Sequence, residues 1–393
     1  METILNFKMY TPTRIAFGAG AVNSLHEYAM PGKKALLVIS NGKSTKSNGY
    51  LDRVEEQLHL AGVETVLFDQ IEANPLKSTI MAGGNCAKKN SCDFIVALGG
   101  GSVIDASKAI SFMATNDGDY WDYIWGGTGK CQPIKNKPIP VIAITTTAGT
   151  GSEVDPWGVV SNEETQEKIG FGTDDSYPVL AIVDPELMLS VPPKFTAYQG
   201  FDALFHSVES YVSKFANLQS DMYALTAIEN VSHNLAEAVA SGNNIEARTR
   251  VAFGNTLSGI VMTLSLTTSQ HSLEHAMSAF HHNLPHGAGL IMLSKAFFTH
   301  FINKHGCDER FIRMAQAMGM PEAKEPMDFI RMLAKLQEDC GVANLKMSDY
   351  GITPDEFEKM AINAKETMGA LFEADRVQLS TEDCVNIYKD SYK

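Results

Sequence analysis

The sequence predicts an α/β domain followed by an all-helical domain, with the boundary near residue 187. Up to Pro185, continuous apolar runs alternate with segments of helical period, which is typical of a parallel sheet with right-handed crossover helices. No run of comparable strand character follows, and long helical-period segments fill the rest of the chain. We therefore divide the 393 residues into 1–187, the α/β domain, and 188–393, the helical domain.

Each element of the α/β domain follows from its local pattern. The first twenty residues alternate apolar and polar side chains and predict a short β-hairpin around Thr11-Pro12-Thr13. Apolar runs predict buried strands at 35–40, 63–68, 94–99, 141–147 and 180–184. Helical periodicity predicts helices at 49–61, 76–90 and 102–115. In the second domain it predicts helices at 194–213, 217–240, 245–267, 270–280, 287–304, 308–319, 325–341, 353–364 and 381–391.

Composition excludes several classes of partner. The net charge is −14 and the sequence has no basic run, so we expect no nucleic-acid partner. The N-terminus lacks the apolar core of a signal peptide and no window is long enough to span a membrane, which predicts a cytoplasmic protein without membrane contact. The six cysteines are scattered without a C-x-x-C, as in reduced cytosolic proteins.

Five polar residues between Gly200 and Gly287 form a candidate metal site. Asp202 and His206 are four residues apart, as are His271 and His275, so each pair lies on one face of a predicted helix. His286 follows in a Pro-containing loop. Imidazoles combined with one carboxylate suit a divalent transition metal such as iron or zinc, whereas calcium and magnesium prefer more oxygen ligands.

Two glycine-rich loops after predicted strands form a candidate nucleotide site. Gly99-Gly100-Gly101-Ser102 joins a strand to a helix, where the free N–H groups and the helix dipole favour a pyrophosphate. Ile104 stands at the third glycine position of the dinucleotide fingerprint. The loop at 145–153, TTTAGTGSE, can surround a nucleotide with backbone and hydroxyl groups. The strand at 35–40 ends in Asn41-Gly42-Lys43-Ser44 without a carboxylate, which favours NADP(H) over NAD(H).

Together these segments resemble the iron-containing (group III) alcohol dehydrogenases, most closely their bacterial NADPH-dependent aldehyde reductase and butanol dehydrogenase branch. The resemblance covers nearly the whole chain, through YTPTRIAFGAGAV, EANP, LGGGSVIDASKAI, TTTAGTGSEV, GFDALFHSVESY, HSLEHAMSAF and LPHGAGL. It implies a Rossmann-like dinucleotide-binding domain and a helical metal-binding domain, an architecture similar to that of dehydroquinate synthase, with the active site in the cleft between them.

The resemblance also implies roles for individual residues. The metal ligands would be Asp202, His206, His271 and His286, and His275 would be the catalytic proton relay near the nicotinamide. The cofactor contacts would be Asn41, Gly42, Ser44, Asn74, Gly99, Gly100, Gly101, Ser102, Asp105, Thr146, Thr147, Thr150 and Lys168. The expected metal is Fe²⁺, with Zn²⁺ or another divalent metal as alternatives.

The expected reaction interconverts a primary alcohol and its aldehyde with NAD(P)(H), while the metal polarises the carbonyl oxygen. We expect a homodimer or a higher homo-oligomer. The spacing from His271 to His286 is one residue longer than the family pattern, which leaves His275 or His282 as an alternative third ligand.

Three other classes of protein fit the sequence less well. A metal-dependent lyase similar to dehydroquinate synthase would need basic residues near the metal, but 200–215 and 270–290 supply only Lys214. A metal hydrolase would leave the two glycine-rich loops without a role. A non-catalytic binding protein would have no use for the complete set of ligand types.

Overall fold

A six-stranded parallel sheet forms the centre of the unit Thr11–Ser190 in the computed structural model, which describes residues 4–393. The strand order is β1-β8-β5-β4-β2-β3 and every neighbouring pair is parallel. The strands are β1 (Arg14–Phe17), β2 (Lys34–Ser40), β3 (Glu64–Ile71), β4 (Phe94–Gly99), β5 (Val141–Thr145) and β8 (Leu180–Val183). The apolar runs that predicted β2, β4, β5 and β8 are buried, as expected for strands covered on both faces.

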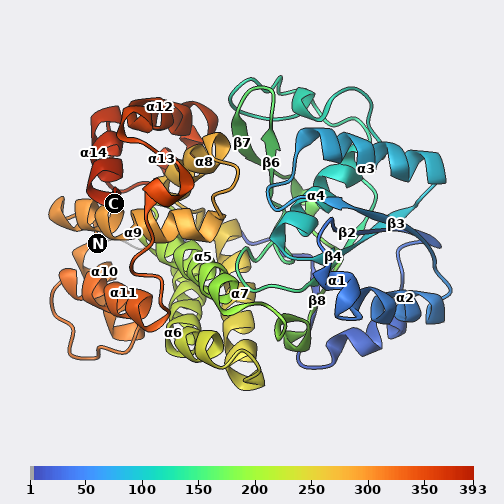
Figure 1. Ribbon diagram of the computed structural model, residues 1–393, viewed down its shortest axis with the longest axis horizontal. Helices are drawn as coiled ribbons and strands as arrows, with labels where there is room; N and C mark the ends of the chain where they lie inside the picture. The colour runs from blue at the N-terminus through green and yellow to red at the C-terminus, as the bar shows by residue number, and fades with distance from the viewer. Residues whose placement is uncertain (1–3) are drawn as a thin grey trace. The chain divides into compact units, whose positions relative to one another are not determined.

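Helices cover both faces of this sheet (Figure 1). On one face, η1 (Ala21–Glu27) and α2 (Tyr50–Leu60) share a core with alternate residues of the central strands, such as Leu37, Val96 and Ile144. On the other face lie α3 (Lys77–Asn90) and α4 (Gly101–Met113), which pack closely because Gly83 of α3 faces Ile110 of α4. The short α1 (Ser44–Ser47) follows β2, and η2 (Tyr120–Asp122), η3 (Asp174–Ser176) and η4 (Pro185–Met188) occur in connecting segments.

The N-terminal hairpin around Thr11-Pro12-Thr13 is a prediction that the structure contradicts. β1 pairs in parallel with β8 at the edge of the sheet, and Ile4 makes an isolated parallel bridge with Asn217. Pro12 has no N–H to donate to a hairpin ladder, whereas β8 offers a complete row of backbone partners to Arg14–Phe17. Residues 1–3 lie outside the described residues.

A two-stranded antiparallel hairpin, β6 (Gly158–Asn162) and β7 (Glu167–Phe171), was not predicted. Its turn is rich in charged and hydroxyl residues, so its sequence has little of the apolar continuity that marks the central strands. The hairpin packs on α4, where Gly158 approaches the backbone of Asp105.

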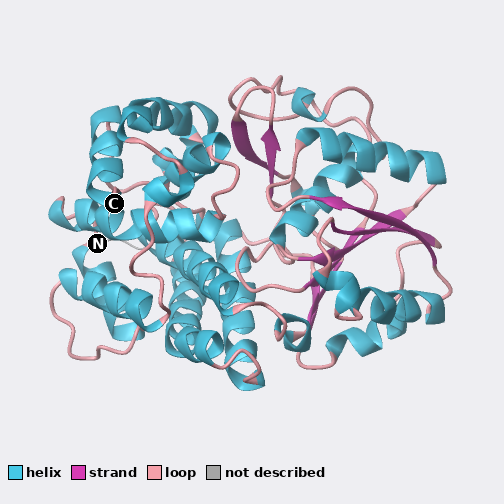
Figure 2. Cartoon of the chain, in the orientation of Figure 1, coloured by secondary structure: helices cyan, strands magenta, loops and turns pink. Residues whose placement is uncertain are grey.

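The second unit, Val191–Lys393 with the N-terminal segment up to Tyr10, is helical; none of its described residues belongs to a named strand (Figure 2). Its main helices are α5 (Pro193–Val212), α6 (Leu218–Ala240), α7 (Ile245–Ser265), α8 (Ser269–Phe280), α9 (His286–Asn303), α10 (Asp308–Ala317), α11 (Met327–Asp339), α12 (Phe357–Thr367) and α14 (Thr381–Ser391). Shorter elements are η5 (Met347–Tyr350), η6 (Pro354–Glu356) and α13 (Gly369–Glu373). Helix α5 is buried along almost its whole length and contacts α6, α7 and α9, so it is the central helix of this unit.

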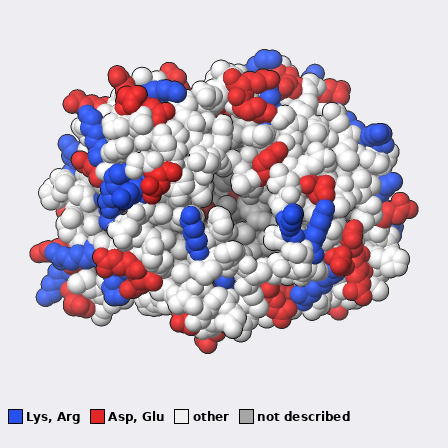
Figure 3. Space-filling view, in the orientation of Figure 1, with Lys and Arg blue, Asp and Glu red and all other residues white. Residues whose placement is uncertain are grey.

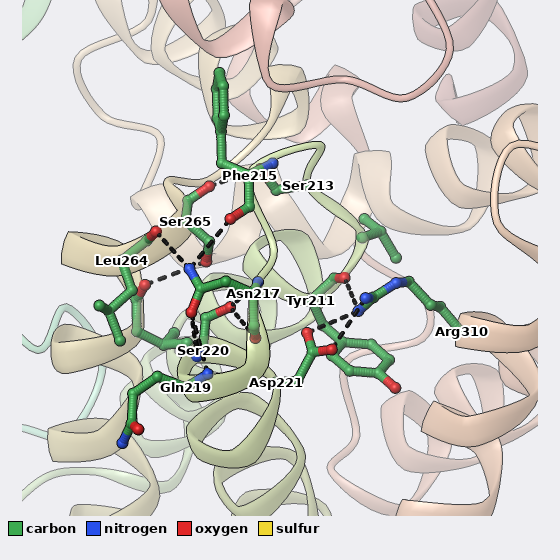
Figure 4. Close-up of polar contacts among 12 residues, drawn as sticks. Tyr211, Ser213, Phe215, Asn217, Gln219, Ser220, Asp221, Leu264, Ser265 and Arg310 are labelled. Carbon is green, nitrogen blue, oxygen red and sulfur yellow. Dashed lines mark hydrogen bonds and ion pairs between the residues drawn. The ribbon is translucent and has the colours of Figure 1, made fainter. Parts of the chain in front are cut away.

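A polar network fixes the turn between α5 and α6 (Figure 4). The Asn217 side chain accepts hydrogen bonds from the amides of Gln219 and Ser220 and donates one to the carbonyl of Leu264 in α7. Nearby, Arg310 of α10 donates to both carboxylate oxygens of Asp221. The network satisfies two free N–H groups at the start of α6, and because Arg310 also donates to the carbonyl of Tyr211 on α5, it joins four helices.

The distribution of basic side chains and the length of the apolar helices bear on the predictions about nucleic acid and membranes. On the face shown in Figure 3, Lys and Arg side chains are scattered among acidic ones and form no continuous basic area. Among the described residues, no single helix is both long and apolar enough to cross a membrane, and α7 and α8 reach that length only as a pair bent by 108°.

Candidate functional site

Three helices of the second unit carry the predicted metal ligands. Asp202 and His206 lie one turn apart on α5 and are 4% and 6% exposed. His271 lies near the start of α8 and is also buried. His286 is the first residue of α9 and is the more exposed ligand, with 22% of its side chain accessible.

Three of the four predicted ligands, Asp202, His271 and His286, converge on one point, and His206 lies beside Asp202. The Oδ1 atom of Asp202 lies 3.7 Å from Nε2 of His206, 3.7 Å from Nε2 of His271 and 3.5 Å from Nε2 of His286. The ring centroids of His206 and His271 are 4.5 Å apart, and those of His271 and His286 are 5.4 Å apart. Ligand atoms of Asp202, His271 and His286 all lie within 4.8 Å of one another, close enough to surround one ion.

The residues present fit a divalent metal. Among the described residues, Oδ1 of Asp202 and Nε2 of His271 are buried and have no hydrogen-bond partner. Such atoms are costly inside a protein unless something binds them. A carboxylate and three imidazoles are ligands that Fe²⁺ and Zn²⁺ accept readily, so the donor set and the unpaired atoms agree.

Two buried glutamates, which sequence reasoning missed, accept hydrogen bonds from the Nδ1 atoms of two ligand histidines. Oε1 of Glu209 on α5 accepts a hydrogen bond from Nδ1 of His271 at 2.6 Å, and its other oxygen accepts from the backbone and hydroxyl of Thr268. Oε2 of Glu274 on α8 accepts from Nδ1 of His286. Both glutamates are 0% exposed. A Glu in an otherwise apolar helical segment was the signal that could have revealed them, because an isolated buried carboxylate is rare.

The electrostatics of the cluster favour a cation. Burial alone would raise the pKa of Asp202, but the surrounding His206, His286 and His271 lower it well below its usual range. Burial alone would lower the pKa of His271, but the Glu209 and Asp202 carboxylates raise it to about 10. Both shifts have the same cause, which is that the buried carboxylates favour positive charge at this point.

A glycine sets the distance between two of the ligand-bearing helices. A Cβ at Gly287, the second residue of α9, would lie 2.2 Å from the carbonyl oxygen of Tyr198 on α5. No side chain fits in this space, so the backbones of α9 and α5 touch directly beside His286. This contact brings His286 close to Asp202.

The alternative third ligands are placed differently. His282 is exposed in the loop between α8 and α9. His275 is buried on α8, and its ring centroid lies 5.2 Å from that of His286 and 6.4 Å from that of His271. The extra residue in the loop thus leaves His286 beside Asp202, and His275 lies next to the cluster; its proton-relay role stays a prediction.

The two loops predicted to bind the nucleotide pack against each other in the first unit. Gly99 at the end of β4 pairs with Thr145 at the end of β5. A Cβ at Gly100 would lie 2.9 Å from Oγ1 of Thr147, and a Cβ at Gly101 would lie 2.2 Å from Cγ2 of Thr150. The bare glycine backbone leads into α4, whose N-terminus has no side-chain cap. This cradle suits a pyrophosphate, because glycine main chain and the hydroxyl side chains of Thr147 and Thr150 lie together at the start of a helix.

A buried charge network supports this cradle. Lys108 of α4 is 1% exposed and donates to Ser152 Oγ at 2.7 Å, to Asp155 Oδ1 at 3.1 Å and to the carbonyl of Trp157 at 2.6 Å. Asp105, a predicted cofactor contact, accepts from Ser152 Oγ and from the amide of Val159. One of its oxygens thus holds the threonine-rich loop and the other holds β6, and its contact with a cofactor stays a prediction.

The remaining predicted cofactor contacts lie on several elements of the same unit. Asn41, Gly42 and Ser44 are exposed where β2 ends and α1 begins. Ser102 donates its hydroxyl to the carbonyl of Ala73, which precedes Asn74. Lys168 is buried on β7 near Asp105. Burial raises the pKa of Asp105, while Lys108 and, more weakly, Lys168 act to lower it. The amide N–H of Thr146 donates a hydrogen bond to the carbonyl of Gly99, so Thr146 is part of the cradle.

Known proteins share both the sequence and the fold. Residues 12–185 match the family model described as iron-containing alcohol dehydrogenase, and residues 196–392 match that of the C-terminal domain of the Fe-containing alcohol dehydrogenase family. The chain is 35% identical over 93% of its length to a choline dehydrogenase of Bacillus subtilis, covering 90% of that protein. It is 29% identical over 99% of its length to the NADH-dependent butanol dehydrogenase A of Clostridium acetobutylicum, covering 100% of that protein.

A solved structure has the same fold. It is an archaeal halo-thermophilic alcohol dehydrogenase from a Red Sea brine pool, 33% identical, with a TM-score of 0.94 and coverage of 99% of this chain and 100% of the other.

Proposed function

Because the chain belongs to the iron-containing alcohol dehydrogenase family, it is an oxidoreductase acting on alcohols and aldehydes, and we propose that Asp202, His206, His271 and His286 hold its metal. The family implies a divalent metal, iron, and NAD(H). The observation that carries the proposal is the convergence of three Nε2 atoms on Asp202 Oδ1, at 3.5 to 3.7 Å. We assign Fe²⁺, with Zn²⁺ as the alternative that the same donors accept.

The substrate that this site supports is a primary alcohol or its aldehyde. Choline and butanol, in the names of two relatives, are hydroxyl compounds of this kind. The reaction converts the alcohol and oxidised nicotinamide into the aldehyde, reduced nicotinamide and one proton. The bound metal supplies Lewis-acid polarisation of the substrate oxygen, and the nicotinamide supplies or accepts the hydride.

The protein's own groups have separate tasks in this reaction. Asp202 contributes negative charge that keeps a cation in the buried cluster, while Glu209 fixes the ring of His271 through Nδ1. An imidazole nitrogen of His275 carries the substrate's hydroxyl proton, since this ring is next to His286 and is not needed as a ligand. The glycines at 99–101 bind the pyrophosphate of the cofactor, and Thr146, Thr147 and Thr150 surround it.

The decisive experiment removes one ligand and measures bound metal together with turnover. In His286→Ala we expect loss of the metal and of aldehyde-dependent NADPH oxidation, with unchanged circular dichroism. His282→Ala is the matched control, because it removes an exposed imidazole from the preceding loop and should keep both properties. Full turnover by the His286 variant, or by wild-type protein after verified metal removal, would refute the proposal.

The preferred cofactor is proposed to be NADP(H). The segment at 41–44 has no carboxylate to bind the ribose hydroxyls, and Lys43 is exposed there, whereas Lys46 is paired with Asp69 at 2.5 Å. Lys43→Ala should raise KM for NADPH several-fold and leave KM for NADH unchanged. Equal KM values for the two cofactors in the wild type would contradict the assignment.

The proposed assembly is a cytoplasmic homodimer or a higher homo-oligomer. The edge strand β1 exposes Ile15 and Phe17, which are 39% and 38% accessible, and a sheet edge with apolar side chains favours pairing with another chain. Light scattering of the purified protein should give a multiple of the chain mass of 42.8 kDa, and a monomer would rule out this assembly.

A further inference from the structure

Glu274 and Glu209 have equivalent positions behind two of the proposed ligands. Each is completely buried, and each accepts a hydrogen bond from Nδ1 of a histidine whose Nε2 faces Asp202. Because the two nitrogens lie on opposite sides of the imidazole ring, a proton held at Nδ1 leaves the Nε2 lone pair available to a cation. The tautomer of each ring is thus set by its carboxylate.

His286 depends on this contact more than His271 does. His271 lies within α8, so the helix fixes its Cα and its direction, and its side chain is 5% exposed. His286 follows the loop at 281–285, begins α9 and is 22% exposed on its side chain. Its ring borders the imidazoles of His271 and His275, and the contact with Glu274 fixes which nitrogen faces Asp202.

Glu274 is itself held rigidly. A Cβ at Gly289, in the first turn of α9, would lie 2.7 Å from Cγ of Glu274 and 2.9 Å from its Oε1. The carboxylate therefore lies against the first turn of α9, where the positive end of the helix dipole stabilises negative charge. The same turn carries His286, so the Glu274 carboxylate of α8 packs against the turn of α9 that begins with its hydrogen-bond partner.

We propose that Glu274 is a positioning residue that fixes the tautomer and orientation of His286 and thereby sets the affinity of the site for its metal. This inference rests on the proposed function, in which His286 is a ligand. Carboxylates in such positions orient the ring and raise the basicity of the ligand nitrogen, and their loss typically weakens metal binding by about 10- to 100-fold.

A competing role would make Glu274 a ligand itself. Ligand atoms of Glu274, His275 and His286 also lie within 4.8 Å of one another. The positioning role is favoured because Oε2 of Glu274 already contacts Nδ1 of His286, while Oε1 packs against the backbone at Gly289. The two roles differ in whether Glu274 belongs to the donor set, which a cobalt spectrum reports.

The test titrates metal-free protein with Co²⁺, without nicotinamide cofactor, and records the visible absorption bands. Glu274→Gln keeps the shape and an oxygen acceptor but loses the charge, and Glu274→Leu loses both. We expect Kd for Co²⁺ to rise about tenfold in Glu274→Gln and further in Glu274→Leu, with band positions unchanged. Asp375→Asn is the matched control: it alters a buried carboxylate that receives the Ser269 amide of α8, and its Kd should equal that of the wild type.

The outcomes separate this inference from the proposed function. Wild-type affinity in Glu274→Gln, or a shifted band that places Glu274 among the ligands, would overturn the positioning role. Should Glu274→Leu fail to fold, the Gln variant alone decides. The titration of His286→Ala serves as the reference: if it binds Co²⁺ as tightly as the wild type does, the proposed metal site itself is wrong. If only the Glu274 variants bind normally, the site stands and the positioning role is wrong.

Discussion

Replacing Lys108 with methionine should destabilise the α/β unit far more than removing a surface lysine. The Lys108 ammonium is buried and bonded to Ser152, Asp155 and the carbonyl of Trp157. Burial raises the pKa of Asp155 to about 7 even though Lys108 opposes this. Without the ammonium, the buried Asp155 carboxyl either carries an uncompensated charge or has to take up a proton, and breaking a buried ion pair in this way costs about 3 to 5 kcal/mol.

The control and the rescue are both available in this chain. Lys46 pairs with Asp69 at 2.5 Å, but their side chains are 46% and 41% exposed, so Lys46→Met should cost no more than about 1 kcal/mol. Adding Asp155→Asn to Lys108→Met removes the isolated charge and keeps an acceptor for the Trp157 amide. The double variant should therefore recover a large part of the loss.

Urea unfolding followed by tryptophan fluorescence measures this effect in the relevant unit. All three tryptophans, Trp121, Trp125 and Trp157, lie within Thr11–Ser190, so their emission reports the unfolding of the α/β unit. The free energies are compared at a constant denaturant slope. A loss below about 1 kcal/mol for Lys108→Met, equal to that of the surface control, would show that the buried network does not support the cradle.

Two further predictions follow from the same contacts. Gly101→Ala places a Cβ 2.2 Å from Thr150, so Kd for NADPH should rise at least tenfold. Gly369→Ala is the control, because its Cβ meets open space and should leave this Kd unchanged. Equal Kd values for the two variants in a fluorescence titration would argue against the cradle. Burial raises the pKa of Asp375 from 3.8 to about 7, so the folded state prefers the protonated acid and this group's contribution to stability is lost as the pH rises from about 4 to 7. Asp375→Asn keeps an oxygen acceptor for the Ser269 amide, so its free energy of unfolding relative to the wild type should increase across that range by up to roughly 4 kcal/mol, at about 1.4 kcal/mol per pH unit. Thermal unfolding measures this difference, and parallel pH curves for the two proteins would contradict it.

Strands that are buried on both faces, and helices with a regular apolar period, were predictable from the sequence. The runs that became β2, β4, β5 and β8 are apolar because both faces of the sheet are covered, and periodicity detects this directly. The helices α5 and α8 were predicted within a residue of their observed ends, and the i, i+4 spacing placed Asp202 with His206 and His271 with His275.

The features that the sequence did not predict correctly have a different cause: each depends on partners that are distant in sequence. Arg14–Phe17 could have formed a hairpin or joined any sheet edge, and four residues do not reveal that β8 is the partner. Glu209 and Glu274 stand out as carboxylates in apolar helical segments, but the sequence does not show that an imidazole lies beside each. The extra residue before His286 was similarly ambiguous, because loop length alone does not show where the next helix begins.

The contact between Gly287 and Tyr198 should be insensitive to pH and salt concentration. The approach of α9 to α5 depends on the absence of a side chain, with main chain meeting main chain. Such a spacer has no proton to lose and no charge for salt to screen. The separation of the ligand-bearing helices should therefore remain constant across changes in acidity and ionic strength that would alter an ion pair, and a single added methyl group at residue 287 is enough to disturb it.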